Sequence, residues 1–150
     1  MWKLSNKGRY AVRALSDMAF HEDGSPLQIK DIAKRQRIPL RFLEQIFQDL
    51  KRAGLARSKR GPRGGYRLAR GPAEIRVGDV LRAIDGPGAA PRGTPARAPR
   101  ELREVTDAVF DDLALAVERC FEKVTLEDVC ARGEQMGIRR GLRPLSAYVI

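Results

Sequence analysis

R-S-K-R-G-P-R-G-G-Y-R, residues 57–67, is the stretch of this 150-residue chain that decides the fold. It holds five basic residues and no acidic one, and its three glycines and one proline form a turn that no helix could cross. The flanking residues 55–59 and 66–69 are short and suit strands, so we expect a β-hairpin with a cationic tip. Such a tip can lie along a phosphate backbone and insert an arginine into a narrow minor groove. The alternative is a solvated surface hairpin.

Two short helices are predicted directly upstream of this hairpin. The first covers residues 29–36 and is broken by the three residues before Leu40. The second runs from Leu40 to Ala53, and Gly54 suits the position just past a helix end. A helix, a three-residue turn, a second helix and a basic hairpin, in that order, are typical of a winged helix-turn-helix. In that fold the second helix enters the major groove, and the wing contacts the backbone or the minor groove.

The second helix of the pair is predicted to have one buried face and one polar face. At about 100° per residue, four apolar side chains share one side and long polar side chains lie opposite. Arginine and glutamine there are residue types that read guanine and adenine edges. A polar face alone is ordinary solvation, but beside a basic hairpin it indicates a binding surface. The apolar residues are Leu43, Ile46, Phe47 and Leu50, and the polar ones are Arg41, Gln45, Gln48 and Arg52, with Glu44 on the flank.

The pattern around these elements is mostly helical. We expect a first helix over residues 5–20, a short strand at 75–77 and a brief helix over 78–84. Residues 88–100 contain five prolines or glycines and no large apolar residue, which predicts a flexible loop. The fold class is therefore mostly α with a small β-hairpin wing.

A long helix is predicted from about Arg100, where apolar residues recur at three- and four-residue steps, close to a coiled-coil seam. This seam can dock on its own domain or pair with a second copy. We expect a homodimer, because a helix-turn-helix protein reads about one half-site and gains affinity by pairing two. The seam residues are Leu102, Val105, Val109, Leu113, Ala116 and Cys120.

Thr125, with Asp128 three residues later, forms a capping box that opens a last short helix through Ala131. The predicted organisation is a DNA-binding domain over residues 1–86, a loop over 87–100, the dimerisation helix and final helix over 101–131, and a tail over 132–150.

The basic charge is confined to the first part of the chain. Residues 1–86 hold 19 Lys and Arg against 9 Asp and Glu, whereas residues 87–150 hold 10 of each, so the net charge of +10 lies in the first part. This asymmetry indicates a face that binds nucleic acid or another anionic surface. No apolar run approaches the ~20 residues of a membrane helix, and the polar N-terminus does not resemble a secretory signal. Two cysteines make no disulfide framework, so we expect a cytoplasmic location.

No catalytic motif appears in the sequence, which argues against an enzyme. A basic RNA-binding module is the competing class, but it would tend to expose stacking aromatic residues. Double-stranded DNA is therefore the expected partner.

Four motifs occur along the chain in a fixed order. They are L-S-N-K-G-R-Y-A-V-R-A-L near the N-terminus, I-A-K-R-Q-x-I-P-L-R-F-L-E-Q-I-F in the helix pair, R-G-P-R-G-G-Y-R-L in the hairpin and then V-G-D-V-L-R-A-I-D-G-P. Together they resemble the BadM/Rrf-type bacterial transcription regulators. The resemblance implies a sequence-specific regulator, expected to be a repressor, that binds a partly palindromic operator as a homodimer. By position it implies that Arg41, Phe42 and Gln45 line the groove with Glu44 as a discriminator, that Arg60, Gly61 and Arg63 form the minor-groove tip, and that Ser5 and Lys7 touch phosphate.

Several members of that family sense iron, oxidants or nitric oxide through an iron–sulfur cluster. The resemblance places three cysteine ligands between the D-G-P segment and the start of the long helix. Here residues 86–107 contain neither Cys nor His, and Glu104 and Asp107 stand at the head of the helix. We therefore expect no cofactor and no metal.

The two cysteines, Cys120 and Cys130, are ten positions apart in the C-terminal part of the chain. Both are expected to be small buried hydrophobic residues. Two chains would supply four thiolates, but a cluster would form only if the dimer brought all of them together. Control is left open between a partner protein, a small molecule and a thiol switch at Cys120.

Overall fold

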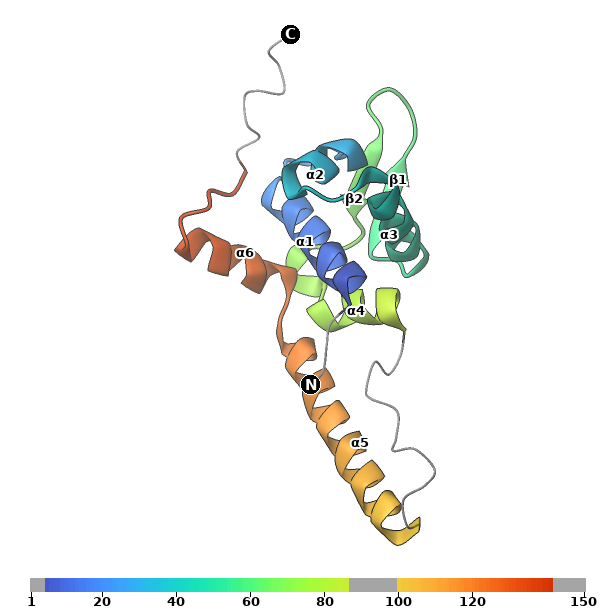
Figure 1. Cartoon of the computed structure of the whole chain (residues 1–150). Coiled ribbons are helices and arrows are strands. Elements are labelled where there is room, and N and C mark those ends of the chain that lie inside the picture. The colour runs from blue at the N-terminus through green and yellow to red at the C-terminus, as the bar shows by residue number, and fades with distance from the viewer. Residues whose placement is uncertain (1–4, 87–99, 142–150) are drawn as a thin grey trace.

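The computed structural model describes residues 5–86 and 100–141 (Figure 1). It is mostly helical with one antiparallel hairpin, as the sequence predicts. The elements, in chain order, are α1 (Asn6–Phe20), α2 (Ile29–Gln36), α3 (Leu40–Arg52), β1 (Ala56–Lys59), β2 (Gly65–Leu68), the 3₁₀ helix η1 (Pro72–Glu74), α4 (Val77–Asp85), α5 (Arg100–Lys123) and α6 (Leu126–Gln135).

Helix α1 is the centre of the core. It packs against α2, α3, α4 and α6, and α5 extends away from these helices, at the end of the molecule opposite the hairpin loop (Figure 1). The apolar spacing of α1 accounts for this position, because Ala11, Leu15, Met18 and Ala19 lie on one stripe and are each at most 2% exposed. From α3, the predicted residues Leu43, Ile46, Phe47 and Leu50 are all fully buried.

The turn between α2 and α3 is made by a residue in an unusual conformation. Arg37 has φ +52° and ψ +46°, and within the described residues it is the one non-glycine with positive φ. The left-handed backbone reverses the chain so that the Ile38 amide donates to the Ala33 carbonyl at 3.0 Å and the Ile38 side chain is buried. For a residue with a Cβ this conformation costs roughly 1–2 kcal/mol.

The hairpin has the predicted position, and its register places Ala56 opposite Leu68 and Lys59 opposite Gly65. Gly65 has φ +148°, and a Cβ added there would lie 2.5 Å from the carbonyl oxygen of Leu27. That close approach lets Leu27 exchange two backbone hydrogen bonds with Tyr66, at 2.7 and 2.8 Å. Glycine therefore joins the wing to the segment before α2.

The C-terminal part of the chain differs from the prediction in two places. Residues 75–77 form no strand: Arg76 makes an isolated bridge to Thr125, directly before α4. The capping box of Thr125 and Asp128 is confirmed, but α6 continues beyond Ala131 to Gln135. Within this extension Gly133 lies against the Phe20 ring, where a Cβ would come within 2.3 Å of Cζ. The predicted loop lies mainly in 87–99, outside the described residues.

The C-terminal end of α5 is fastened to α4 by charged side chains and backbone bonds. Glu122 forms ion pairs with Arg82 and, at 3.3 Å, with Arg76. Beside them, the amide of Val77 donates to the carbonyl of Val124 at 2.8 Å. These contacts join the C-terminal end of α5 to the winged domain.

Candidate nucleic-acid interface

The outward face of α3 carries the polar residues that the sequence placed there. Arg41, Glu44, Gln45 and Gln48 are all exposed, while the apolar face of the same helix is fully buried. No acidic residue lies in the first turn of α3, and no side chain caps its N-terminus. The face can therefore present donors and acceptors to the edges of base pairs.

Phe42 stands between that face and the core. It is half-buried, and its ring meets the Tyr10 ring edge-on, with centroids 5.7 Å apart at 86°. The Arg13 guanidinium lies 5.6 Å from the centroid of the same Tyr10 ring and donates to the Gln36 carbonyl at 2.5 Å. Phe42 thus has a packing role in the free protein besides the groove contact that the family resemblance implies.

The hairpin tip is exposed and basic. Arg60, Gly61 and Arg63 are all exposed, and Gly61 takes a φ of +110° while its carbonyl accepts from the Gly64 amide at 2.9 Å. Neither tip arginine makes an ion pair with a residue that the structure describes. Unpaired guanidinium groups on an exposed loop are suited to a phosphate backbone.

The two predicted phosphate contacts near the N-terminus are engaged within the protein. The hydroxyl of Ser5 accepts from the Gly8 amide at 2.8 Å, capping α1, and donates to Asp85 at 2.5 Å. The Lys7 ammonium forms an ion pair with Asp49 of α3 at 2.7 Å. A phosphate would have to share or displace these partners.

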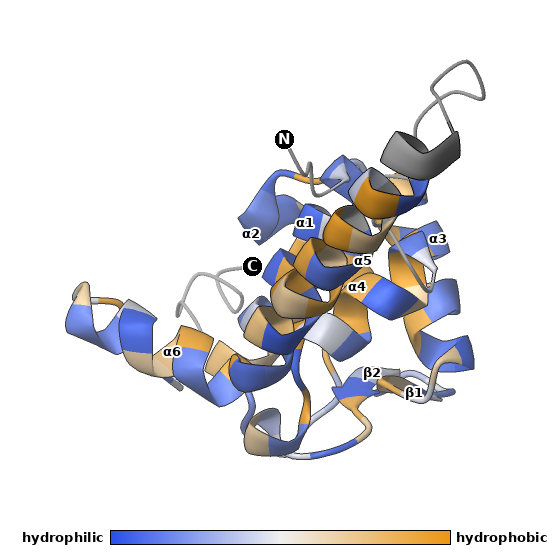
Figure 2. Ribbon diagram, turned by 90° about the horizontal axis from the view of Figure 1, so that it is seen from below, coloured by the Kyte–Doolittle hydropathy of each residue, from blue (hydrophilic) through white to orange (hydrophobic). Residues whose placement is uncertain are grey.

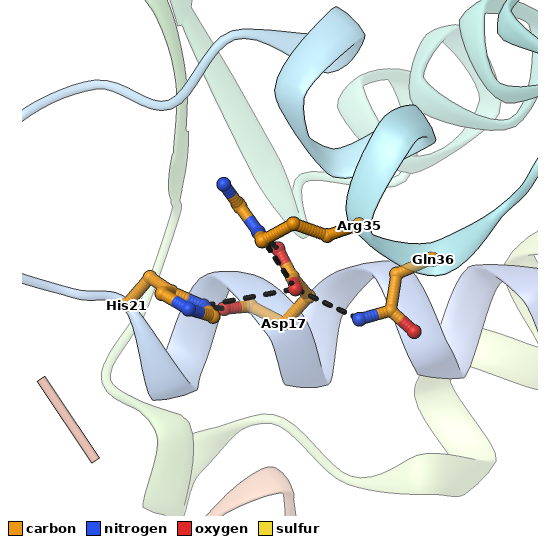
Figure 3. A network of polar contacts seen from close by, with 4 residues as sticks. All are labelled: Asp17, His21, Arg35 and Gln36. Atoms are coloured by element: carbon orange, nitrogen blue, oxygen red, sulfur yellow. Dashed lines mark hydrogen bonds and ion pairs between the residues drawn. The ribbon is translucent and has the colours of Figure 1, made fainter. Parts of the chain in front are cut away.

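A buried polar network, which the sequence reasoning missed, holds α2 against α1 (Figure 3). The carboxylate of Asp17 accepts three hydrogen bonds from Arg35, at 2.6–3.1 Å, and one from the Gln36 amide at 2.8 Å. His21, directly after α1, places Nδ1 2.7 Å from the Asp17 backbone carbonyl oxygen and 3.6 Å from its carboxylate. One feature of the sequence indicates such a network: Asp17 is a charged residue next to the buried stripe of α1, where a carboxylate needs a partner.

Helix α5 leaves apolar residues uncovered in the single chain. Val105, Val109 and Leu113 are 51–62% exposed, and hydrophobic positions recur along this helix (Figure 2). Ala116 and Cys120 continue the stripe and are also exposed, while the Leu102 side chain lies outside the described residues. Over the residues whose side chains are described, the stripe therefore does not dock on its own domain.

The two cysteines have different surroundings. Cys130 is fully buried in the core between α6 and α1, and burial raises the pKa of its thiol. Cys120 is exposed on α5, so the expectation that both are buried is wrong for Cys120 in the single chain. Its position on the seam explains why the apolar pattern alone suggested burial.

Comparison with known proteins assigns this arrangement to a family. The Rrf2 family model, described as an iron-dependent transcriptional regulator, matches residues 4–132. The chain belongs to the Rrf2 family. The HTH-type transcriptional regulator IscR of Vibrio atlanticus (strain LGP32) is 39% identical over 138 residues, covering 91% of this chain and 79% of that protein.

Solved structures agree with this Rrf2 assignment. The T. potens IscR structure has a TM-score of 0.73 at 33% identity, covering 97% of this chain and 96% of that one. The structure of CymR (YrzC), the global cysteine regulator of B. subtilis, has a TM-score of 0.72 at 32% identity, covering 88% and 98%. The relatives are transcriptional regulators and not enzymes, and this Rrf2 chain is a winged-helix DNA-binding regulator. None of its described helices is both long and apolar enough to cross a membrane.

The iron in the family description does not fit the residues of this member. Iron–sulfur clusters are held by converging thiolates, commonly four. The sequence has two cysteines and one histidine, and Cys130 is directed into its own core, where the thiolate is disfavoured. The described residues contain no group of three or more His, Cys, Asp or Glu that could hold a metal ion. A second chain would bring two further thiols, but both buried Cys130 side chains would first have to leave the core.

Proposed function

We propose that this Rrf2 protein is a repressor that binds a partly palindromic operator as a homodimer. The observation that carries the proposal is that the chain has two exposed surfaces, which lie on separate elements. One is the polar face of α3 together with the basic hairpin tip, and the other is the apolar stripe of α5.

Recognition is assigned to α3 and the wing. Arg41, Gln45 and Gln48 read base edges in the major groove, and Glu44 selects against carbonyl-rich edges because a carboxylate accepts from cytosine. Phe42 adds an apolar contact at the rim of the same face. Contacts to phosphate and sugar set the position of the helix in the groove but do not read sequence, so these side chains carry the specificity.

The wing supplies the second DNA contact. Arg60 and Arg63 lie along the backbone or enter a narrow minor groove, and Gly61 allows the approach because it has no side chain. Ser5 and Lys7 touch phosphate after exchanging their internal acidic partners.

Dimerisation is assigned to α5. Val105, Val109 and Leu113 would be buried against the same residues of a second chain, with Leu102, Ala116 and Cys120 extending the seam. A stripe of large apolar residues more than half exposed is unfavourable in water and favours a partner. A homodimer also supplies the two half-sites that a palindrome requires. Two alternatives keep the same fold: control by a partner protein on α5, or a thiol switch at Cys120.

The test is selection of bound duplexes from a random DNA pool, followed by footprinting of the selected site. We expect two inverted half-sites about one helical turn apart or a multiple of it. An RNA duplex of the same sequence should bind more weakly, and transcription in vitro from a promoter that contains the site should decrease. A selected site without inverted symmetry would refute the dimeric arrangement, and equal binding of RNA would favour the RNA-binding class.

A further inference from the structure

The strained turn of the helix-turn-helix carries an arginine whose side chain has no ionic or hydrogen-bonding partner in the described part of the chain. Arg37 is exposed, and its φ of +52° is the conformation that glycine adopts at no steric cost. Strained residues persist where the surroundings hold them, and they cluster at functional sites. Arg37 makes no ion pair or side-chain hydrogen bond with any residue in 5–86 or 100–141.

The neighbouring residues do not supply an internal partner for the Arg37 side chain. Arg35, two residues earlier, is taken up by Asp17, and the Gln36 carbonyl accepts from Arg13. Ahead of Arg37, the first turn of α3 holds no acid, and the next exposed charge is Arg41. An unpaired cation therefore stands at the entry to the recognition helix.

The position of Arg37 at the end of α2 also has a consequence for the helix itself. A cation at the end of α2 interacts favourably with the helix dipole. Lys34 and Arg35 already lie in that last turn, so Arg37 adds a third charge there. Asparagine or glycine at this position would relieve the backbone strain and still end the helix.

We propose that Arg37 is a further DNA-contacting residue, which binds a backbone phosphate of duplex DNA next to the groove occupied by α3. This rests on the proposed recognition by α3. The guanidinium donates hydrogen bonds to phosphate oxygens, and the contact fixes the position of α3 without reading a base. The strain at Arg37 is then offset in the complex and not in the free protein.

The test compares Arg37→Asn, Arg37→Lys and Arg139→Asn with the unmodified chain. Asparagine tolerates the left-handed conformation and removes the charge, whereas lysine keeps the charge. Arg139 is an exposed arginine in the segment after α6. Because α6 and α3 lie on opposite sides of α1, Arg139→Asn removes one positive charge away from the proposed DNA-binding face (Figure 1). Binding to a labelled mixed-sequence duplex of about three helical turns is measured by anisotropy at several salt concentrations.

For Arg37→Asn we expect several-fold weaker binding at low salt. The slope of log K against log salt should also be smaller in magnitude, by about 0.9 for each phosphate that the variant no longer neutralises. Its Tm should not fall, and should change by no more than about 2 °C, because strain relief and removal of the dipole interaction oppose each other. Arg37→Lys and Arg139→Asn should retain the slope of the unmodified chain. An unchanged slope in Arg37→Asn overturns the inference, and a falling Tm with an unchanged slope assigns Arg37 to helix capping. If the unmodified chain binds no duplex, the proposed function fails together with the inference.

Discussion

Replacing Asp17 by asparagine should test whether the polar network holds α2 against α1. The Asp17 side chain is only 1% exposed and accepts bonds from Arg35 and Gln36. Asparagine keeps one acceptor oxygen but presents an NH₂ group to a guanidinium that can only donate. Arg35 then loses its charged partner in a site largely closed to water.

The size of the effect follows from burial. Removing one partner of a buried ion pair costs about 3–5 kcal/mol. The Arg35 side chain is 23% exposed and can be partly rehydrated, so we expect the lower end, about 3 kcal/mol. For a chain of this length that corresponds to a fall in Tm of roughly 6–12 °C.

The assay is urea and thermal unfolding followed by circular dichroism at one fixed protein concentration. Asp49→Asn is the matched control. Its carboxylate is 22% exposed and pairs with Lys7 and Arg52, whose side chains are 33% and 77% exposed, so its removal should cost about 1 kcal/mol. Combining Asp17→Asn with Arg35→Met closes a double-mutant cycle, which should show a coupling energy of about 1–3 kcal/mol. Equal destabilisation by Asp17→Asn and Asp49→Asn, or zero coupling to Arg35, would refute the reasoning.

Four further outcomes are expected. Arg60→Ala or Arg63→Ala should weaken duplex binding for all sequences and reduce its salt dependence in the same anisotropy titration; an unchanged affinity and salt slope would rule out the wing contact. Gln45→Ala should cost on the order of 1–3 kcal/mol at particular base pairs of the selected site and little elsewhere, measured with single-base variants of the operator. Val109→Asp should place an unpaired carboxylate in the apolar seam and give a monomer in sedimentation with loss of operator affinity; a dimer at micromolar concentration would exclude this seam. Anaerobically purified protein should be colourless, with no stoichiometric iron or sulfide by chemical assay, whereas a brown protein that loses its iron when Cys120 is replaced would show that the thiols do converge on a cluster.

Local patterns were enough to predict the helix pair and the hairpin, because their signals are close together in the sequence. The four buried residues of α3 recur at helical spacing, and Gly54 ends that helix with a φ of +73°. In the hairpin, Gly65 makes the backbone contact to Leu27 that a side chain would prevent. The exposure of Gln45 and Arg63 follows from the same patterns.

The interactions that were missed join residues far apart in the sequence. Asp17 meets Arg35 across 18 residues, and Lys7 meets Asp49 across 42, and no periodicity relates such partners. Gly133 shows a second limit of prediction from local sequence. A glycine in a helix usually weakens the helix, yet here it leaves room for the Phe20 ring. The conformation of Arg37 was also hidden, because its side chain gives no local sign of positive φ.

The contacts between α4 and α5 restrict how DNA sites can be spaced. Glu122 with Arg76 and Arg82, and the backbone bond from Val77 to Val124, oppose rotation of α5 against the winged domain. In the proposed homodimer, the two α3 helices would then keep a fixed separation and a fixed angle. Each base pair inserted between half-sites turns one of them by roughly 35° around the duplex axis. The protein would have to break these contacts to follow that rotation, so a single base pair inserted between the half-sites should weaken binding.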